Sequence, residues 1–326
     1  MVLNQSSLNF AQTVPRRMVH RTSDAEVFVT DLAGTEDARG DVRYTAAARL
    51  PTDHAYYGDH RQEQAGFDPL LLLESCRQAS TYGSHRQLGL PVDIQFLVDR
   101  WSIRLHDPAK IPAGDGVGEL HLEEVLHPTV RSGRIRGVRF DLGLRLAGEA
   151  IGSATIEVRC ASREEYRTLR EVQRGDTPPM TGDLTPPDTG TRPAPRLVGR
   201  AEERNVVLAD ASRAVDEVSA TLSPRFDNGS LFDHDYDHYP AMVLMEAARQ
   251  LVLLSIGEGA DRVWLSGLDA RFLRFAELDA PVVATTRAPT HDASEPWQGW
   301  GVRFVQNDAL IAETTLTVAS LNGGTG

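Results

Sequence analysis

Two stretches of the chain place charged and amide side chains inside apolar runs. Residues 74–78 read ESCRQ after four leucines, and residues 246–250 read EAARQ within a run of Ala, Met, Val and Leu. In a helix, residues three apart share a face, so the Glu and the Arg of each stretch can meet. A buried charge is costly unless it has a partner, so these groups must contact each other, a ligand or water. A cleft, where a carboxylate and a cationic group can act together on a ligand, is the natural place for such a pair.

The surrounding patterns predict helices that carry these pairs and strands that enclose them. Residues 69–85 and 240–256 are apolar on nearly all sides and long enough for buried helices, and Pro240 suits a first helical position. Apolar and polar residues alternate over 138–146, as in an antiparallel strand with one buried face. Strands are also expected at 27–29, 94–105, 117–126 and 151–158. Each half is therefore expected to be α+β, a long central helix wrapped by a curved antiparallel sheet, which is the hotdog arrangement.

The chain repeats itself in a fixed order. Four segments recur: ESCRQ at 74 as EAARQ at 246, DIQFL at 93 as DARFL at 269, GVRF at 137 and again at 301, and IGSATIEV at 151 as IAETTLTV at 311. Matches in one order predict a duplicated domain, and hence a tandem hotdog whose halves pair sheet to sheet. Residues 174–196 are rich in Pro, Gly, Thr and Asp, so they are expected to link domains at 1–173 and 197–326.

Composition narrows the class of protein. Of the 326 residues, 41% are hydrophobic and 25% are charged, as in a globular protein. The net charge of −12 argues against nucleic acid and anionic membranes as partners. Cys76 and Cys160 make no disulfide framework, and no apolar run approaches the ~20 residues of a membrane span. A cytoplasmic protein is the simplest interpretation.

The segment before the second predicted helix, FDHDYDHYPAMVLMEAARQ, resembles a motif of hotdog enzymes that act on acyl thioesters. In β-hydroxyacyl-ACP dehydratases, a Pro-Gly-Val-Leu turn leads to a catalytic Glu. Over nearly the full chain outside the linker, the sequence is more specifically similar to the A-factor biosynthesis family of double-hotdog butyrolactone-signal synthases. That family reads His-Pro-x-Asp-His-Val-Pro-Gly-Met before Glu-Ala-x-Arg-Gln; here Asp235 replaces the first Pro and Ala241 the Gly. The first half adds VPRRMVHR, AEVFVTDL, PTDHAYY and LLLESCRQA.

This resemblance implies an acyltransferase. A β-ketoacyl thioester, carried by acyl carrier protein or CoA, would be condensed with the hydroxyl of dihydroxyacetone phosphate. The ester would cyclise to a butenolide phosphate on the way to a γ-butyrolactone, butenolide or furan signal of secondary metabolism. The resemblance implies no cofactor and no metal. Because two fused halves already satisfy the usual hotdog pairing, the chain is expected to be a monomeric pseudo-dimer or a homodimer.

The same resemblance suggests roles for individual residues. Glu246 is the first choice as general base, with a pKa raised by burial, and Arg249 is expected to bind phosphate or polarise the carbonyl. The start of the helix at Pro240 could offer N–H groups to the thioester oxygen. Glu74 and Arg77 are the same pair in the first half, and either or both halves could be active. The expected substrate-binding residues are His234, His238, Gln250, His54 and Gln78.

Other interpretations stay open for several of these features. The Glu–Arg pairs could be structural ion pairs. Residues 233–238, DHDYDH, could hold a metal, although no further ligands of defined spacing follow, and Cys76 could be a nucleophile rather than a small buried side chain. The rival functions are a hotdog dehydratase or thioesterase and a butyrolactone-binding protein without catalysis. The arginines at 131, 134 and 136 could contact an acidic carrier protein or simply be solvated.

Overall fold

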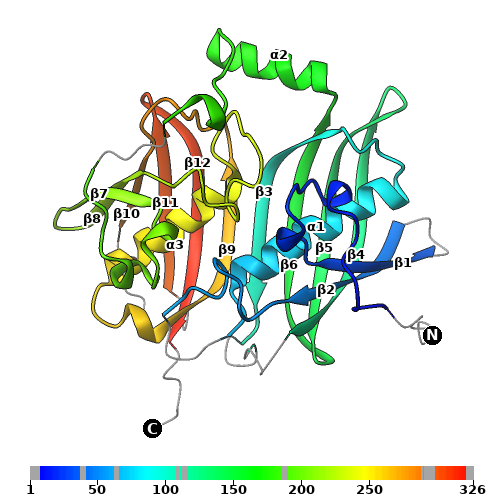
Figure 1. Cartoon of the computed structure of the whole chain (residues 1–326), viewed down its shortest axis with the longest axis horizontal. Helices are drawn as coiled ribbons and strands as arrows, with labels where there is room; N and C mark the ends of the chain where they lie inside the picture. The colour runs from blue at the N-terminus through cyan, green and yellow to red at the C-terminus, as the bar shows by residue number, and fades with distance from the viewer. Residues whose placement is uncertain are drawn as a thin grey trace.

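The computed structural model describes residues 8–36, 42–61, 66–107, 111, 117–185, 190–287, 289 and 298–320. Within them the predicted architecture is confirmed: each half is a long helix inside a curved antiparallel sheet (Figure 1). The central helices are α1, Pro69–Gln87, and α3, Ala241–Ile256. Both predicted helices are thus present, within two residues of their expected ends. No helix of the described residues has the length and apolar character needed to cross a membrane.

The described strands join into one sheet that runs through both halves. Its order is β1-β2-β4-β5-β6-β3-β9-β12-β11-β10-β8-β7. The strands of the first half are β1 Val29–Glu36, β2 Val42–Leu50, β3 Gln95–Leu105, β4 Gly118–Arg131, β5 Arg134–Leu146 and β6 Glu149–Ala161. Those of the second half are β7 Leu208–Arg213, β8 Glu217–Leu222, β9 Val263–Phe272, β10 Val283–Arg287, β11 Gln298–Gln306 and β12 Ala309–Ser320.

The two halves meet where β3 pairs antiparallel with β9. The paired residues run from Arg100 opposite Arg271 to Arg104 opposite Gly267. The predicted sheet-to-sheet pairing of the halves is therefore present as a continuous hydrogen-bonded ladder. Both central helices lie against the same face of this sheet (Figure 1), so the start of each helix is directed toward the other half. The boundaries at residues 173 and 197 stay predictions.

One helix was not expected from the sequence. Helix α2, Arg163–Arg174, follows β6 and lies at one end of the molecule, at the top of Figure 1. Ser162 and Glu165 form a reciprocal capping box at its start, and Gly175 ends it with a φ of 85°. The other described connections contain the 3₁₀ turns η1 Arg16–Val19, η2 Asp24–Glu26, η4 Thr181–Asp183, η5 Pro195–Val198, η6 Glu203–Asn205 and η7 Ala260–Arg262.

The first-half core contains a buried acid away from the Glu–Arg pair. Glu124 on β4 is 2% exposed and accepts a 2.5 Å hydrogen bond from the Ser80 hydroxyl of α1. Burial raises the pKa of Glu124 to about 8, although hydrogen bonds from Ser80 and Tyr44 act in the opposite direction. The carboxyl group is therefore neutral in the folded protein at pH 7, whereas it ionises in the unfolded chain.

This difference predicts a pH dependence of stability. Because the folded pKa lies above the unfolded value, the unfolded state alone releases the proton as pH rises from about 4.5 toward 8. Stability is then full at low pH and falls over this window. Relative to Glu124→Gln, which cannot ionise, the original protein should lose roughly 3 kcal/mol of unfolding free energy between pH 5 and pH 8. Urea unfolding of both proteins across this range measures it, and parallel pH curves would contradict it.

Candidate active site

The Glu–Arg pair of the first half is part of a larger buried network. Glu74 accepts five hydrogen bonds, from Nε and Nη2 of Arg21, from Nε and Nη2 of Arg77, and from Nε2 of Gln78, at 2.7–3.1 Å. The predicted contact between Glu74 and Arg77 is therefore present. Arg21, which follows η1, is an additional partner that the sequence analysis did not name.

The second half repeats this network. Glu246 accepts hydrogen bonds from Arg200 at 2.9 Å, from Arg249 at 2.6 and 3.1 Å, and from Gln250 at 2.6 Å. Arg200 follows η5 as Arg21 follows η1. The signal for these two arginines was in the sequence, because VHR at 19–21 recurs as VGR at 198–200. It was missed because three residues with one mismatch carry little weight alone.

Both carboxylates are held ionised by their arginines. Burial alone would raise the pKa of Glu74, but Arg21 and Arg77 outweigh it and lower that pKa to about 2. Burial likewise opposes Arg200 and Arg249, which together lower the pKa of Glu246. The expectation that burial raises the pKa of Glu246 was therefore wrong, because the sequence analysis counted one arginine where the fold supplies two. A carboxylate with such partners is a weak proton acceptor.

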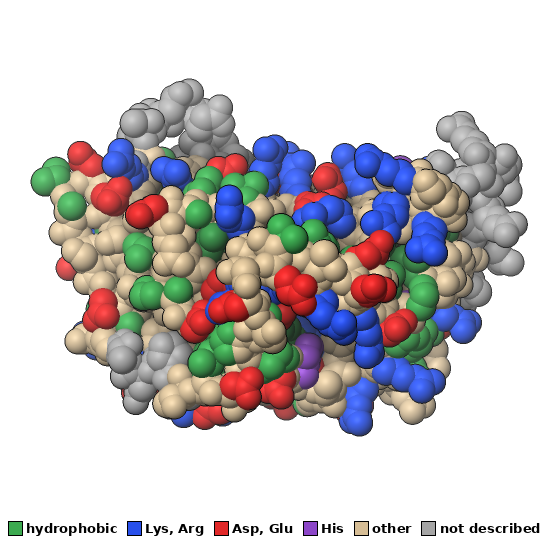
Figure 2. All heavy atoms as spheres, turned by 90° about the horizontal axis from the view of Figure 1, so that it is seen from above, with side chains coloured by type: hydrophobic (Ala, Val, Ile, Leu, Met, Phe, Trp, Pro, Cys, Tyr) green, Lys and Arg blue, Asp and Glu red, His purple; other side chains and the backbone are tan. Residues whose placement is uncertain are grey.

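A cavity of about 710 Å³ opens beside the first network. Its polar lining comes from both halves and includes Glu74, Arg77, Arg21, His234 and His238. The start of α3 also lines it, through Pro240, Ala241 and Met242. The rest of the lining is largely apolar and includes Phe96, Trp101, Phe140, Ile156, Val158, Leu244 and Phe272. On the molecular face seen from above, a histidine lies beside a group of apolar side chains, with arginines and acidic residues around them (Figure 2).

The second network is the more enclosed of the two, since the Arg249 side chain is 10% exposed and that of Arg77 is 19% exposed. Arg249 donates to Asp68 through Nη1 at 2.6 Å, and Asp68 is only 1% exposed. Arg200 stacks over the ring of Tyr56 at 4.4 Å and donates to backbone carbonyls at 56 and 59. Neither Glu246 nor Arg249 is among the residues that line the cavity. Two pairs that look alike in sequence therefore differ in access.

Two histidines at the cavity are oriented by the residues before them. The Nδ1 atom of His234 lies 2.7 Å from Asp233, and that of His238 lies 2.6 Å from Asp237. Burial opposes these carboxylates, but His234 and Arg21 hold the pKa of Asp233 well below its usual range. With Nδ1 bonded to a carboxylate, each neutral ring presents Nε2 as a proton acceptor.

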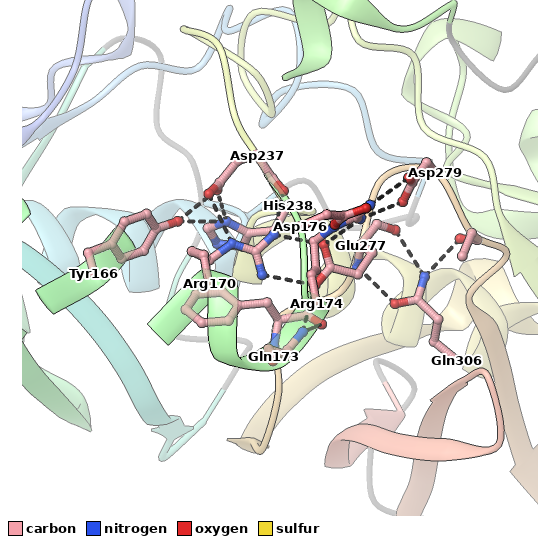
Figure 3. Close-up of polar contacts among 12 residues, drawn as sticks. Tyr166, Arg170, Gln173, Arg174, Asp176, Asp237, His238, Glu277, Asp279 and Gln306 are labelled. Atoms are coloured by element: carbon pink, nitrogen blue, oxygen red, sulfur yellow. Dashed lines mark hydrogen bonds and ion pairs between the residues drawn. The ribbon is translucent and has the colours of Figure 1, made fainter. Parts of the chain in front are cut away.

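The two histidine–aspartate pairs connect to different parts of the fold. Asp233 also accepts from Nη1 of Arg21 at 3.1 Å, so His234 joins the network of Glu74 and Arg77 across the two halves. Asp237 instead accepts from Tyr166 at 2.7 Å and from Arg170 at 2.9 Å, both on α2. Arg170 also donates two hydrogen bonds, of 2.7 and 2.9 Å, to the carboxylate of Glu277 (Figure 3). The unexpected helix thus fixes the loop that carries His238.

The other residues singled out from the sequence lie away from the cavity. His54 contacts Glu26 at 3.3 Å and is nearly enclosed. Gln78 and Gln250 are fully buried, and each ties its helix to the backbone that precedes the first strand of its half. Cys76 is also buried, and burial together with Glu124 raises the pKa of its thiol, which opposes a nucleophilic role. Within the described ranges, no three His, Cys, Asp or Glu side chains form a metal-binding group.

His20 was not named in advance, yet it lines the cavity beside Arg77. Its Nε2 atom lies 3.1 Å from Nε2 of His85, whose Nδ1 atom lies 2.9 Å from the carbonyl of Leu90. Burial, with Arg77 and His85, lowers the pKa of His20 to about 4. His20 is therefore neutral at pH 7 and adds a hydrogen-bonding group, rather than a charge, to the polar end of the cavity.

Comparison with known proteins connects this architecture to a family. The A-factor biosynthesis hotdog domain matches residues 3–162 and again 185–322. A 2-oxo-3-(phosphooxy)propyl 3-oxoalkanoate synthase of Streptomyces virginiae is 33% identical over 278 residues, which cover 82% of this chain and 85% of that protein. A synthase of the same name from Streptomyces coelicolor is 30% identical, with 96% and 94% covered. The dehydratase domain from the CurK module of curacin polyketide synthase shares the fold, with a TM-score of 0.50 and 13% identity over 89% of this chain and 97% of that domain.

Proposed function

Because the chain belongs to the A-factor biosynthesis hotdog family, we propose that it transfers the acyl group of a β-ketoacyl thioester to the hydroxyl of dihydroxyacetone phosphate. The name of its relatives describes the product of this step, since a 2-oxo-3-(phosphooxy)propyl group is the dihydroxyacetone phosphate skeleton and a 3-oxoalkanoate is the β-ketoacyl part. The observation that carries the proposal is one cavity whose lining combines many apolar side chains with Arg77, His234 and the start of α3.

The reaction exchanges one acyl bond for another. The hydroxyl oxygen attacks the thioester carbonyl, the carbon–oxygen bond forms, and the carbon–sulfur bond breaks. The hydroxyl proton goes to a base and returns to the departing sulfur, so the products are an ester and a free thiol. The chain must therefore supply a proton acceptor, a partner for the oxygen anion, a cationic group for the phosphate and room for the acyl chain. The ester can then close to a butenolide phosphate with loss of water.

His234 is the group we assign as the base. Glu74 suits the role poorly, because it already accepts five hydrogen bonds and has a pKa of about 2. His234 has its Nδ1 atom fixed by Asp233, and among the described residues Nε2 has no hydrogen-bond partner. It also shares Asp233 with Arg21, so the base is coupled to the network that holds Arg77. His238 lies on the same cavity but is anchored to α2, so we assign it to substrate binding.

The sequence-based assignment of the base to Glu246, with Arg249 beside it, stays a prediction, and the geometry favours the other half. Glu74 and Arg77 line the 710 Å³ cavity, whereas Glu246 and Arg249 are not among its lining residues. We therefore assign Glu74 to positioning Arg77 and Arg21, and Arg77 to binding the anionic oxygens of the substrate. The sequence analysis expected the start of α3 to offer N–H groups to the thioester oxygen, and this helix start lines the same cavity.

The thioester carrier enters from a groove that adjoins the cavity. Leu97, Val158, Arg159 and Leu169 line both, and Arg131 and Arg136 border the groove. Arg136 pairs with Glu165 and Arg159 pairs with Asp99. Arg131, whose side chain has no partner among the described residues, supplies the guanidinium we assign to the acidic surface of an acyl carrier protein or to the phosphates of CoA. The substrates proposed here are intracellular metabolites, which supports a cytoplasmic location.

Product analysis of the purified protein tests the proposal. A panel of β-ketoacyl thioesters on carrier protein and on CoA is incubated with dihydroxyacetone phosphate, with dihydroxyacetone as the matched control without phosphate. Thiol release should require the phosphorylated alcohol, and mass spectrometry should find the phosphorylated ester or its dehydrated ring. Thiol release without any alcohol would indicate a thioesterase. Water loss from β-hydroxyacyl thioesters without thiol release would indicate a dehydratase, and either outcome would overturn the proposal.

A further inference from the structure

The two central helices begin differently. Helix α1 follows Asp68, whose Oδ1 atom accepts the backbone N–H of Leu70 at 2.8 Å and the Nη1 group of Arg249 at 2.6 Å. One carboxylate oxygen is thus held by a helix start and by a guanidinium of the opposite half. Arg200 and Arg249 outweigh the effect of burial and lower the pKa of Asp68, so this oxygen belongs to an anion.

The open half has the same groups without the carboxylate. By the internal repeat, Pro240 stands where Asp68 does, Met242 where Leu70 does, and Arg77 where Arg249 does. The backbones agree, since Asp68 has φ −57° and ψ 126° and Pro240 has φ −59° and ψ 148°. No side chain caps α3, and within the described part of the chain neither the N–H of Met242 nor Nη1 of Arg77 has a hydrogen-bond partner. Both residues line the cavity.

We infer that the open cavity contains an anion subsite between Nη1 of Arg77 and the first-turn N–H of Met242, and that Asp68 permanently fills the equivalent subsite of the enclosed half. The helix start alone would not define a site. The second half supplies the independent observation, because the equivalent guanidinium and N–H hold an anionic oxygen there. Within the acyl transfer proposed above, on which this assignment rests, the occupant is a substrate oxygen anion, either of the phosphate group or of the thioester carbonyl during attack.

Pro240→Asp tests the subsite by giving the open half its own internal carboxylate. The backbone angles at Pro240 already suit an Asp, which should cap α3 and pair with Arg77 as Asp68 pairs with Arg249. We expect Tm to stay equal or rise while kcat/KM for acyl transfer falls at least 100-fold. Pro240→Ala, which removes the proline but adds neither a cap nor a charge, is the matched control, and its fall in kcat/KM should be at least tenfold smaller than that of Pro240→Asp.

Two readouts separate the possible occupants and the possible failures. If the anion is the phosphate, Pro240→Asp should raise KM for dihydroxyacetone phosphate, and calorimetry should show inorganic phosphate binding at least tenfold more weakly. If the anion is the carbonyl oxygen, kcat should fall while KM for dihydroxyacetone phosphate is unchanged. Phosphate binding needs no turnover, so its loss in Pro240→Asp supports the subsite even where the acyl transfer fails. Unchanged kinetics and phosphate binding in a folded Pro240→Asp protein would overturn it. Should that variant not fold, Arg77→Met must show the same losses, and normal behaviour would overturn the subsite.

Discussion

Replacing His234 with asparagine is expected to lower kcat for ester formation about 10³-fold, within the usual range for the loss of a general base. Asparagine can keep the hydrogen bond to Asp233, so the network through Arg21 to Glu74 should persist. What disappears is the free Nε2 atom on the cavity side. Steady-state kinetics with β-ketoacyl thioester and dihydroxyacetone phosphate measure the loss, and thermal unfolding checks that the fold is retained.

His238→Asn is the matched control for this experiment. The two histidines lie four residues apart, each beside an aspartate and each on the same cavity, but only His234 is joined to the Glu74 network. The control should change KM more than kcat. If His238→Asn shows the large loss of kcat while His234→Asn is nearly normal, the base is His238. The connection of His234 to the Glu74 network through Asp233 and Arg21 then does not contribute to catalysis.

Glu74→Gln and Glu246→Gln are expected to separate the two halves. Each change leaves two arginines without their shared carboxylate, all of them buried except the partly buried Arg77, so each should reduce the unfolding free energy by about 3–5 kcal/mol. Only Glu74→Gln should also disturb a guanidinium on the cavity, and a misplaced catalytic group can reduce the rate about 10²-fold. Glu246→Gln should keep its activity below its melting temperature.

The sequence-based assignment of the base to Glu246 makes the opposite prediction for this pair. Activities are measured well below the lower Tm, so that stability and catalysis are read separately. If Glu246→Gln loses ester formation while Glu74→Gln turns over normally, the catalytic site lies at Glu246 in the second half, and our assignment of the site is wrong.

The fold was predictable because its signals were long or repeated. Two apolar 17-residue runs, an alternating strand at 138–146 and four ordered repeats each point to the same architecture, and local pattern agrees with global fold. The contact between Glu74 and Arg77 was predictable for the same reason, since helical spacing fixes it. Helix α2 was missed because its mostly polar residues offer no core-facing stripe, and its contacts are charged pairs with distant residues such as Glu277.

The location of the open site could not be read from the repeat, because the repeat makes the two pairs look alike. The difference depends on Asp68 and Pro240, which occupy equivalent positions, and the partner of Asp68 is Arg249, 181 residues away. The direction of the pKa of Glu246 also depended on a remote partner, Arg200. Such contacts are products of tertiary structure, and a single sequence leaves them undetermined.

The site is assembled from both copies of the duplicated unit. The first copy contributes the carboxylate and its arginines, and the second contributes His234, His238 and the uncapped helix start. In a homodimer of one identical hotdog unit, a carboxylate that plugged one catalytic centre would plug its symmetry mate as well. Covalent fusion removes that constraint, because the two copies can differ in sequence. A stabilising carboxylate can then occupy the anion subsite of one copy while the site of the other copy stays open to substrate.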